Sequence, residues 1–523
     1  MDDQVVLYLM PHKIQKKRYD DMKKAAKCRK FTIVDDFSPE VTHIVTEFET
    51  QEQAVRHIGL NTTEENNEQS PEFLKISWFT ESIKARKPVE IQDHHRLLRN
   101  TQEEVHVEGN EGASEPRFSE WACQRSTPLK HQNDFLATQL EILQKYAEMK
   151  DENHDYSRAL AFRRASCVVK SFPITVTNVN QLNGINHVGP HSKRVIGELL
   201  DGYCDEINRI VNEEWFEKMK MFTGVFGVGP STAKKWIERG WTSIKDAQES
   251  TDISKDWRVQ WGLAFHDDLM NPVKSNEAYR FTEIIQTEAE KILPGIVVQL
   301  TGGFRRGKHQ GHDIDILFTH PNGEETGFLP KLLTRLEKLN MVLCGSHESS
   351  SFHEKVLSED FKLTARGQLD HFEKWLGICK LPKDLVSGDD AQIPLSNGLE
   401  KCTEIKENVD SLDDYEPKAK KQRKCHGDNS PFTIATSERD WIARRVDFIM
   451  SPYSQYYYAL VGWTGSKQFN RDLRLYSQKV LNRKLTSHGF YDFTTGKTLP
   501  ANSETEVFEN LNLQYQHPKN RNC

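Results

Sequence analysis

Blocks of apolar positions alternate with polar, helix-like stretches over the first part of the chain. Three short apolar runs predict strands, at residues 5–9, 31–34 and 42–46. Residues 76–89 predict a helix, with Ser77 as its candidate N-cap and Pro88 beyond its last turn. Strands that alternate with helices favour a parallel sheet. We therefore expect a small α/β domain here, with Trp78 anchored in its core.

The pattern changes twice before residue 271. Residues 99–120 carry few bulky apolar side chains and many charges, which predicts a flexible linker. From residue 121 to about 270 the pattern is helical, with glycine-bracketed turns at residues 184–189 and 226–236. Such turns let the backbone approach a phosphate and present its N–H groups. Either turn alone fits an ordinary glycine-capped hairpin, but the pair favours a sequence-independent clamp on DNA backbone.

Strands and helices alternate again beyond Leu293, except over residues 384–438, which are rich in charge and serine. A structureless loop of this length is unusual inside a domain, so we expect a disordered insertion between strands. The basic cluster at residues 418–424 is either a nuclear localisation signal or a solvated charge run that balances acidic residues upstream.

Composition narrows the class of protein. The 523 residues suffice for several domains, and 37% hydrophobic against 28% charged residues predicts a soluble, polar protein. A net charge of −7 argues against a protein that coats nucleic acid over its whole surface. The sequence has no long apolar segment, and its start is too short and too acidic for a signal peptide. Nine cysteines without C-x-x-C spacing suggest reduced thiols and no zinc site, hence a cytosolic or nuclear protein away from membranes.

Candidate chemistry gathers in the segment TGGFRRGKHQGHDIDILFTHP, residues 301–321. Alternate side chains of a strand share a face, so Asp313 and Asp315 point one way while Ile314 and Ile316 point into the core. Two carboxylates on one face repel each other unless a cation joins them, and oxygen ligands favour Mg²⁺ or Mn²⁺. The alternative is a pair of solvent-facing carboxylates on an edge strand.

The residues just before these carboxylates suit a triphosphate. Gly302 and Gly303 predict a turn with free backbone N–H groups, and Arg306 and Lys308 supply positive charge. His312 stands beside the first carboxylate. Because glycines, cations and carboxylates agree on one chemistry, we interpret the segment as a metal and triphosphate site.

A third carboxylate, Asp447, lies in a second apolar strand within residues 443–452, as two-metal phosphoryl transfer requires. G-G-x-x-R-x-K, D-x-D and a later Asp together resemble the palm of the family X DNA polymerases. Residues 460–474 are similar to the nucleotide-binding stretch of the branch that holds the mu-type polymerases and the terminal transferases. ACQRSTPL, QGHDIDILFTHP, GWTGSKQF, SHGFYD and NRN are more similar to the mu type.

The resemblance covers nearly the whole chain and implies a multidomain α/β and α+β protein. Its parts would be a BRCT domain (residues 1–98), a linker (99–120), an eight-kilodalton-like helical domain with the first helix-hairpin-helix (121–215), fingers with the second (216–292), a palm (293–460) and a thumb (461–523). Trp78 matches the tryptophan helix of BRCT domains.

The resemblance also implies four sets of site residues. Two Mg²⁺ or Mn²⁺ ions would be held by Asp313, Asp315 and Asp447. The nucleotide would be contacted by Gly302, Gly303, Arg305, Arg306, Lys308, His312, Gly462, Trp463 and Lys467. DNA would be contacted by Val225, Phe226, Gly227, Val228, Gly229, Arg445 and Arg474. A monovalent cation, Na⁺ or K⁺, would be bound by the carbonyls of Thr223, Val225 and Val228.

The activity implied is that of a nuclear, DNA-directed DNA polymerase that fills gaps and bridges ends in non-homologous end joining. Its substrates would be DNA ends, gapped duplex, and deoxyribo- and ribonucleoside triphosphates. The BRCT domain would recruit a monomer to Ku and the ligase complex. The rival interpretations are a template-independent terminal transferase, a non-catalytic end-binding scaffold and an RNA nucleotidyltransferase.

Four positions qualify the resemblance. Gly462 stands where relatives that reject ribonucleotides have Tyr, which predicts tolerance of a 2′-hydroxyl. Val195 stands at the position of the Schiff-base lysine, which excludes lyase chemistry there. Thr486 replaces an expected Asn and leaves a minor-groove contact in doubt. The loop at residues 344–369, expected between a strand and a helix near Asp370, would be mobile and govern template use.

Overall fold

The computed structural model describes residues 5–97, with gaps at 12–13, 15, 30, 39, 49–50 and 59–70, and then residues 118–150, 157–252, 254–352, 370–386 and 430–523. The chain divides into two compact units, Met1–Glu115 and Pro116–Cys523. Over the described ranges, no helix is both long and apolar enough to span a bilayer.

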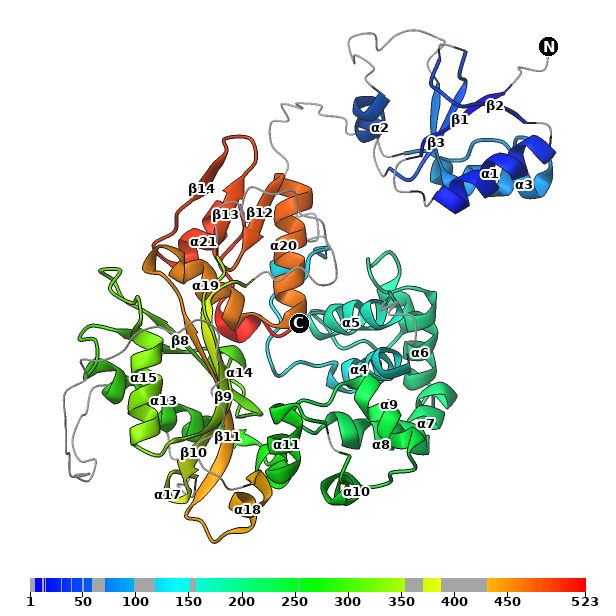
Figure 1. Ribbon diagram of the computed structural model, residues 1–523. Helices are drawn as coiled ribbons and strands as arrows, with labels where there is room; N and C mark the ends of the chain where they lie inside the picture. The colour runs from blue at the N-terminus through cyan, green and yellow to red at the C-terminus, as the bar shows by residue number, and fades with distance from the viewer. Residues whose placement is uncertain are drawn as a thin grey trace. The chain divides into compact units, whose positions relative to one another are not determined.

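The first unit contains a four-stranded sheet of order β2-β1-β3-β4, and every pairing in it is parallel, as the sequence predicts (Figure 1). Its strands are β1 (Val6–Leu9), β2 (Thr32–Val34), β3 (His43–Thr46) and β4 (Glu72–Lys75). Its helices are α1 (Lys16–Cys28), α2 (Gln51–Ile58), α3 (Ile76–Ala85) and the 3-10 turn η1 (Asp93–His95). Helices α1 and α3 share one apolar cluster with the strands, and α2 packs into another.

Helix α3 begins at Ile76, the first residue of the predicted range, but it ends earlier than the sequence predicts and has a different N-cap. Strand β4 runs directly into it, so Lys75 is the N-cap residue and makes no side-chain cap hydrogen bond. Ser77 lies inside the helix, and its prediction as the cap is wrong. The helix ends at Ala85 because Arg86 adopts left-handed backbone angles. Trp78 is fully buried and donates a 2.9 Å hydrogen bond to the Val89 carbonyl, which confirms it as a core anchor.

The second unit starts with a helical body. Its elements are η2 (Ala122–Gln124), α4 (Asp134–Lys150), α5 (Ser157–Lys170), η3 (Val179–Leu182), α6 (Pro190–Leu200), α7 (Asp205–Val211), α8 (Glu214–Thr223), α9 (Pro230–Glu238), α10 (Ile244–Glu249), α11 (Trp257–Ala264) and α12 (His266–Met270). One apolar core extends from Leu136 to Leu263. Arg125 lies 5.0 Å from the Phe118 ring and donates to the Ser119 carbonyl, so the end of the predicted linker packs on this body.

A five-stranded sheet of order β6-β8-β11-β10-β9 follows (Figure 1). Its strands are β6 (Val297–Leu300), β8 (Asp313–Thr319), β9 (Val342–Glu348), β10 (Glu373–Pro382) and β11 (Trp441–Met450). Helices α13 (Ser275–Glu290) and α15 (Phe328–Lys338) cover one face. Helix α13 precedes Leu293 in the chain yet packs into the core of this sheet. The short helix α14 (Gly302–Arg305) and the strand pair β5 (Val273–Lys274) and β7 (Gln310–Gly311) lead into β8.

The last elements pack on the opposite face of the sheet and beyond it. They are η4 (Tyr453–Gln455), α19 (Tyr456–Thr464), α20 (Lys467–Leu481), β12 (Arg483–Thr486), β13 (Gly489–Asp492), β14 (Lys497–Leu499), α21 (Glu504–Asn510) and η5 (Pro518–Asn520). Helix α19 contacts Leu317 and Ile449, whose side chains leave the sheet on the face away from α13 and α15.

Two loop predictions need correction. Helices α17 (Lys383–Val386) and α18 (Pro431–Thr436) occupy the two ends of the stretch 384–438, so the expected disorder is wrong there. Residues 387–429, which include the basic cluster 418–424, lie outside the described residues. Strand β9 continues to Glu348, and a strand rather than a helix follows Asp370, so the segment 344–369 joins two antiparallel strands.

Candidate active site

Three carboxylates meet where β8 and β11 run side by side. The strands are parallel, and their register places Asp447 opposite Asp315. One oxygen from each of Asp313, Asp315 and Asp447 lies within 4.8 Å of the others. Ile314 and Ile316 are fully buried in the core behind the sheet, which confirms the predicted alternation. The carboxylates therefore share the face that α19 borders.

The neighbouring carboxylates disfavour one another's charged forms. Burial raises the pKa of Asp315 well above its ordinary value, and Asp313 and Asp447 raise it further. Burial also raises the pKa of Asp447 to about 6, although Arg445 opposes the rise. Each charged form is disfavoured because it is desolvated beside another negative charge. A divalent cation would relieve this repulsion, and an all-oxygen donor set suits Mg²⁺ or Mn²⁺.

Gly302 brings the backbone against one of these carboxylates. Its φ of +59° is left-handed, and a Cβ added there would lie 2.1 Å from Asp315 Oδ2. Thr301 fixes the approach, since its N–H and its hydroxyl donate to the Asp315 carbonyl at 2.8 and 3.1 Å. Only glycine fits this position. The glycine turn and the carboxylate strand therefore form one site.

Arg306 is held firmly beside the turn. Its Nε donates to Asn522 Oδ1 at 3.0 Å, and its Nη1 donates to the Thr464 carbonyl at 2.7 Å. Its Nη2 lies 3.8 Å from where a Cβ on Gly303 would stand. Partial burial lowers the pKa of Lys308, and Arg306 adds to the effect. Crowded cations of this kind favour an anion between them. His312 is exposed beside Asp313.

Arg305 is placed differently from its neighbour. Its guanidinium donates to both Glu504 oxygens at 3.0 and 2.6 Å and to Thr464 Oγ1 at 2.8 Å. Arg521 donates to the same carboxylate at 2.8 Å. Burial alone would raise the pKa of Glu504, but the hydrogen bond from Arg305 and the charge of Arg521 lower it. Arg305 therefore ties α14 to α21 with both terminal nitrogens of its guanidinium, although the resemblance assigns it to the nucleotide.

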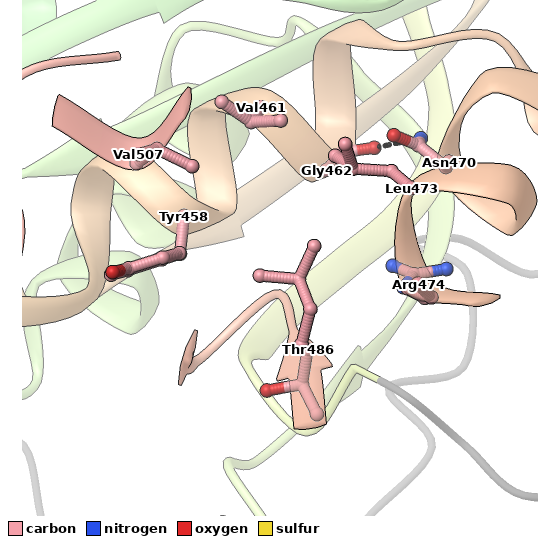
Figure 2. A pocket seen from close by; sticks show the side chains of 9 residues that line it. Tyr458, Val461, Gly462, Asn470, Leu473, Arg474, Thr486 and Val507 are labelled. Atoms are coloured by element: carbon pink, nitrogen blue, oxygen red, sulfur yellow. Dashed lines mark hydrogen bonds between the residues drawn. The ribbon is translucent and has the colours of Figure 1, made fainter. Parts of the chain in front are cut away.

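The predicted nucleotide pocket lies at the junction of α19 and α20. A Cβ on Gly462 would meet Ser487 Oγ at 2.8 Å, and Asn470 donates to the Gly462 carbonyl at 2.6 Å. Figure 2 shows Gly462, Asn470, Arg474 and Thr486 around a small cavity. The cavity has room for about one water molecule, so it does not itself hold a nucleotide.

Other predicted contacts surround this pocket. Trp463 lies on α19 beside Gly462, and Lys467 is exposed at the start of α20. Partial desolvation of its ammonium group by neighbouring atoms lowers the pKa of Lys467, and Arg163 of the helical body adds to the effect. The Thr486 hydroxyl accepts from the His488 N–H at 3.1 Å and is 96% buried, so it is engaged within its own turn.

The second glycine turn joins α8 to α9. Gly227 has a φ of +86°, and a Cβ there would lie 2.7 Å from Arg258 Cβ. Nothing lies within 4 Å of a Cβ added at Gly229, the N-cap of α9, so the helix start is open for a phosphate. Thr223, Val225 and Val228 all lie on or beside this turn, where the Val228 N–H donates to the Val225 carbonyl at 3.0 Å.

Arg445 joins this turn to the carboxylates. Its guanidinium lies 4.9 Å from the Phe226 ring and donates to Asp313 Oδ2 at 3.3 Å. Arg474 is farther along α20, where burial lowers its pKa while Asp370 opposes the change. The structure thus brings the predicted DNA turn, the metal ligands and the nucleotide pocket into one neighbourhood.

Sequence reasoning missed the side chains that support this site. His488 accepts a 2.8 Å hydrogen bond from the His371 N–H, and its ring lies 4.4 Å from that of Phe352. Burial lowers the pKa of His488 to about 3, and His371 adds to the effect, so the ring is neutral. His488 therefore holds both ends of the segment that includes residues 353–369. In the sequence, its motif SHGFYD indicates only a resemblance.

A second group of possible metal ligands lies in the first unit, at Glu81, His94 and His95. His95 Nδ1 accepts from the Gln92 N–H at 3.1 Å. Its Nε2 must then carry the proton, which it donates to Glu81 at 3.1 Å. Because neither ring nitrogen of His95 has a free lone pair, this arrangement does not fit a metal.

Comparison with known proteins matches most of the second unit to described domains. The models named DNA polymerase beta palm and DNA polymerase beta thumb match residues 273–453 and 459–522. The fingers domain of DNA polymerase lambda matches residues 220–270, and a helix-hairpin-helix domain matches residues 131–205. The DNA-directed DNA/RNA polymerase mu of Homo sapiens is 33% identical over 99% of this chain and 94% of that protein. The DNA nucleotidylexotransferases of Xenopus laevis and Bos taurus are 32% and 31% identical, over 99% of this chain and 94% and 93% of those proteins.

Proposed function

Because the chain belongs to the family X DNA polymerases, we propose that it works in the nucleus as a DNA-directed DNA polymerase in non-homologous end joining, where it fills short gaps and bridges broken ends. The observation that carries the proposal is the meeting of Asp313, Asp315 and Asp447 beside a glycine turn and fixed cations. A scaffold has no need of three mutually repelling carboxylates.

The residues present fit a two-metal reaction. Asp313, Asp315 and Asp447 would hold the ions, which supply activation of the primer 3′-hydroxyl and charge stabilisation on the phosphates. Arg306 and Lys308 would neutralise the triphosphate as negative charge moves onto the leaving pyrophosphate. Because Arg306 is already fixed by two hydrogen bonds, it needs little reorganisation when the nucleotide arrives.

Nucleotide choice follows from Gly462 in this proposal. Its backbone offers no side chain beside the sugar, so deoxyribo- and ribonucleoside triphosphates would both be accepted. Val195 is fully buried in the helical core, and Lys193 donates to Asn183 Oδ1 at 3.1 Å, so lyase chemistry at this helix is not part of the function.

The parallel α/β module of the first unit supports a BRCT domain that recruits a monomeric polymerase to Ku and the ligase complex. Its separate cores, with Trp78 buried, are consistent with an independent binding domain. Recruitment of the full chain to Ku-bound DNA ends, compared with a chain that starts at Pro116, tests this role. Equal recruitment of both chains would contradict it.

DNA would be gripped at the two helix-hairpin-helix turns, and the carbonyls of Thr223, Val225 and Val228 would bind Na⁺ or K⁺ beside the primer strand. The open start of α9 at Gly229 supports the approach of a phosphate. The test replaces a monovalent cation that does not bind by K⁺, stepwise and at constant ionic strength. The affinity of the protein for primer DNA should rise with the K⁺ concentration.

Template use separates this proposal from its rival, a template-independent terminal transferase. The test is primer extension on a gapped duplex and on a single strand, each supplied with one nucleotide at a time, with Asp447→Asn as the inactive control. We expect the gapped duplex to be extended faster and its template base to select the nucleotide. Faster, unselective extension of the single strand would favour the rival.

A further inference from the structure

We propose that Asn522 is a positioning residue for Arg306 and thereby sets the affinity of the enzyme for the triphosphate of the incoming nucleotide. The inference rests on the proposed function, in which Arg306 binds that triphosphate. Asn522 belongs to none of the predicted sets of site residues. Its role follows from its contacts with Arg306, Lys519 and Thr127.

Two anchors fix the plane of the Arg306 guanidinium. Nε donates to Asn522 Oδ1 at 3.0 Å, and Nη1 donates to the Thr464 carbonyl at 2.7 Å. These bonds leave Nη2 beside Gly303, the residue of the turn that the triphosphate would approach. Thr464 alone would let the group pivot about a single bond. Asn522 supplies the second hydrogen bond, which is needed to fix the orientation of the planar guanidinium toward a phosphate.

The amide of Asn522 is itself oriented. Its Nδ2 donates to the carbonyls of Lys519 and Thr127 at 2.7 and 3.3 Å, so its oxygen must face Arg306. An aspartate could not make the two donations. An alanine would leave the Lys519 carbonyl and Arg306 Nε without these partners, while the Thr127 carbonyl would keep only the backbone N–H of residue 522. The side chain is about nine-tenths buried, so water does not readily replace it.

The backbone around Asn522 is held on both sides. The N–H of Asn522 donates to the Thr127 carbonyl at 3.1 Å, and the Thr127 N–H donates to the backbone carbonyl of Asn520 at 2.8 Å. Arg521 is fully buried and donates to Glu504 at 2.8 Å and to the Gln516 carbonyl at 2.7 Å. The segment that leads into the helical body therefore supports a residue of the triphosphate site through Asn522.

A double-mutant cycle distinguishes positioning from general structural support. Asn522→Ala and Arg306→Met, which keeps the stem and removes the donors, are made singly and together. Nucleotide binding to the enzyme–DNA complex is measured by titration, and incorporation by single-turnover kinetics. We expect Asn522→Ala to weaken nucleotide affinity on the order of 10-fold, as for a hydrogen bond to a charged group. The loss should vanish in the Arg306→Met background.

Three controls sharpen the cycle. Asn520→Ala changes the same residue type two positions away, where the described structure gives the side chain no hydrogen bond, and should behave as wild type. DNA affinity should be unchanged by Asn522→Ala, and the variant should remain folded at the assay temperature although the unpaired Lys519 carbonyl lowers its melting temperature. Asn522→Gln, which keeps the amide but displaces it, should reproduce the loss if the alanine variant is unstable.

The outcomes separate the two proposals. Losses that add in the double mutant, or an unchanged nucleotide affinity, would overturn the role of Asn522 while leaving polymerase activity intact. A wild-type enzyme that binds nucleotide with the expected coupling but does not incorporate it would overturn the proposed function instead. A wild-type enzyme that does not bind nucleotide would overturn both.

Discussion

Replacing Gly302 with alanine tests whether the glycine turn and the metal ligands act as one site. A Cβ there would stand 2.1 Å from Asp315 Oδ2, and contacts under 3.0 Å essentially do not occur, so the oxygen must retreat by about 1 Å. Left-handed backbone at a non-glycine residue adds ~1–2 kcal/mol of strain. A displacement of about 1 Å in a reacting constellation lowers rates by roughly 100-fold, or ~2.7 kcal/mol.

The matched control is Gly323→Ala. Gly323 has a similar φ of +72°, and nothing lies within 4 Å of its added Cβ. Both variants should therefore lose the free energy of unfolding that the left-handed backbone costs, and Gly302→Ala should lose more because of its contact with Asp315, while only Gly302→Ala loses kcat/KM in gap filling with Mg²⁺. Near-wild-type incorporation by Gly302→Ala, or an equal loss in both variants, would refute the coupling of Gly302 to Asp315.

Four further predictions concern single residues of the second unit. Asp447→Asn should abolish incorporation, an effect worth several kcal/mol by order of magnitude, with DNA binding nearly intact in gel-shift assays; normal incorporation would remove Asp447 from the metal site. Because the pKa of Asp447 is raised to about 6, its carboxylate is protonated below that pH, so activity should fall as pH drops through 6 and partly recover with more Mg²⁺; a pH profile insensitive to Mg²⁺ would count against this. Gly462→Tyr should raise discrimination against ribonucleotides, measured as a kcat/KM ratio, but the side chain must displace Ser487; strong discrimination in the wild type would contradict the role of Gly462. Borohydride should trap no adduct between the helical body and a 5′-deoxyribose phosphate, since Val195 has no amine; a trapped adduct would show another nucleophile.

The part of the site that is local in sequence could be predicted. Alternation along one strand places Asp313 and Asp315 together whatever the rest of the fold does. The adjacent arginines could not be separated in this way. The motif G-G-x-x-R-x-K selects Arg306, but the resemblance assigns Arg305 to the nucleotide as well. Only the contacts with the distant Glu504 and Asn522 show that Arg305 forms an ion pair and that Arg306 is oriented beside the glycine turn.

The fold shows the same limit. Parallel pairing in the first unit follows from alternating elements, whereas the N-cap of α3 at Lys75 depends on how β4 continues into the helix. The sequence predicts the long polar segments but not the residues at which they begin and end. Strand β9 and helix α18 extend into them because contacts with residues far along the chain stabilise both elements. His488 gave no local signal at all, since its role depends on strands that meet only in the folded protein.

The pairing of β10 with β11 has a consequence for the tolerance of this enzyme to insertion. Their ten paired positions run from Glu373 opposite Met450 to Pro382 opposite Trp441, so the chain between them closes a hairpin. The entropy of closing a loop grows only logarithmically, so doubling its length adds about 0.6 kcal/mol. Sliding β11 by a single residue against β8 would instead turn Asp447 to the opposite face and remove it from Asp315. Insertions and deletions between residues 387 and 429 should therefore leave catalysis nearly unchanged. A single residue inserted within β11 should abolish catalysis.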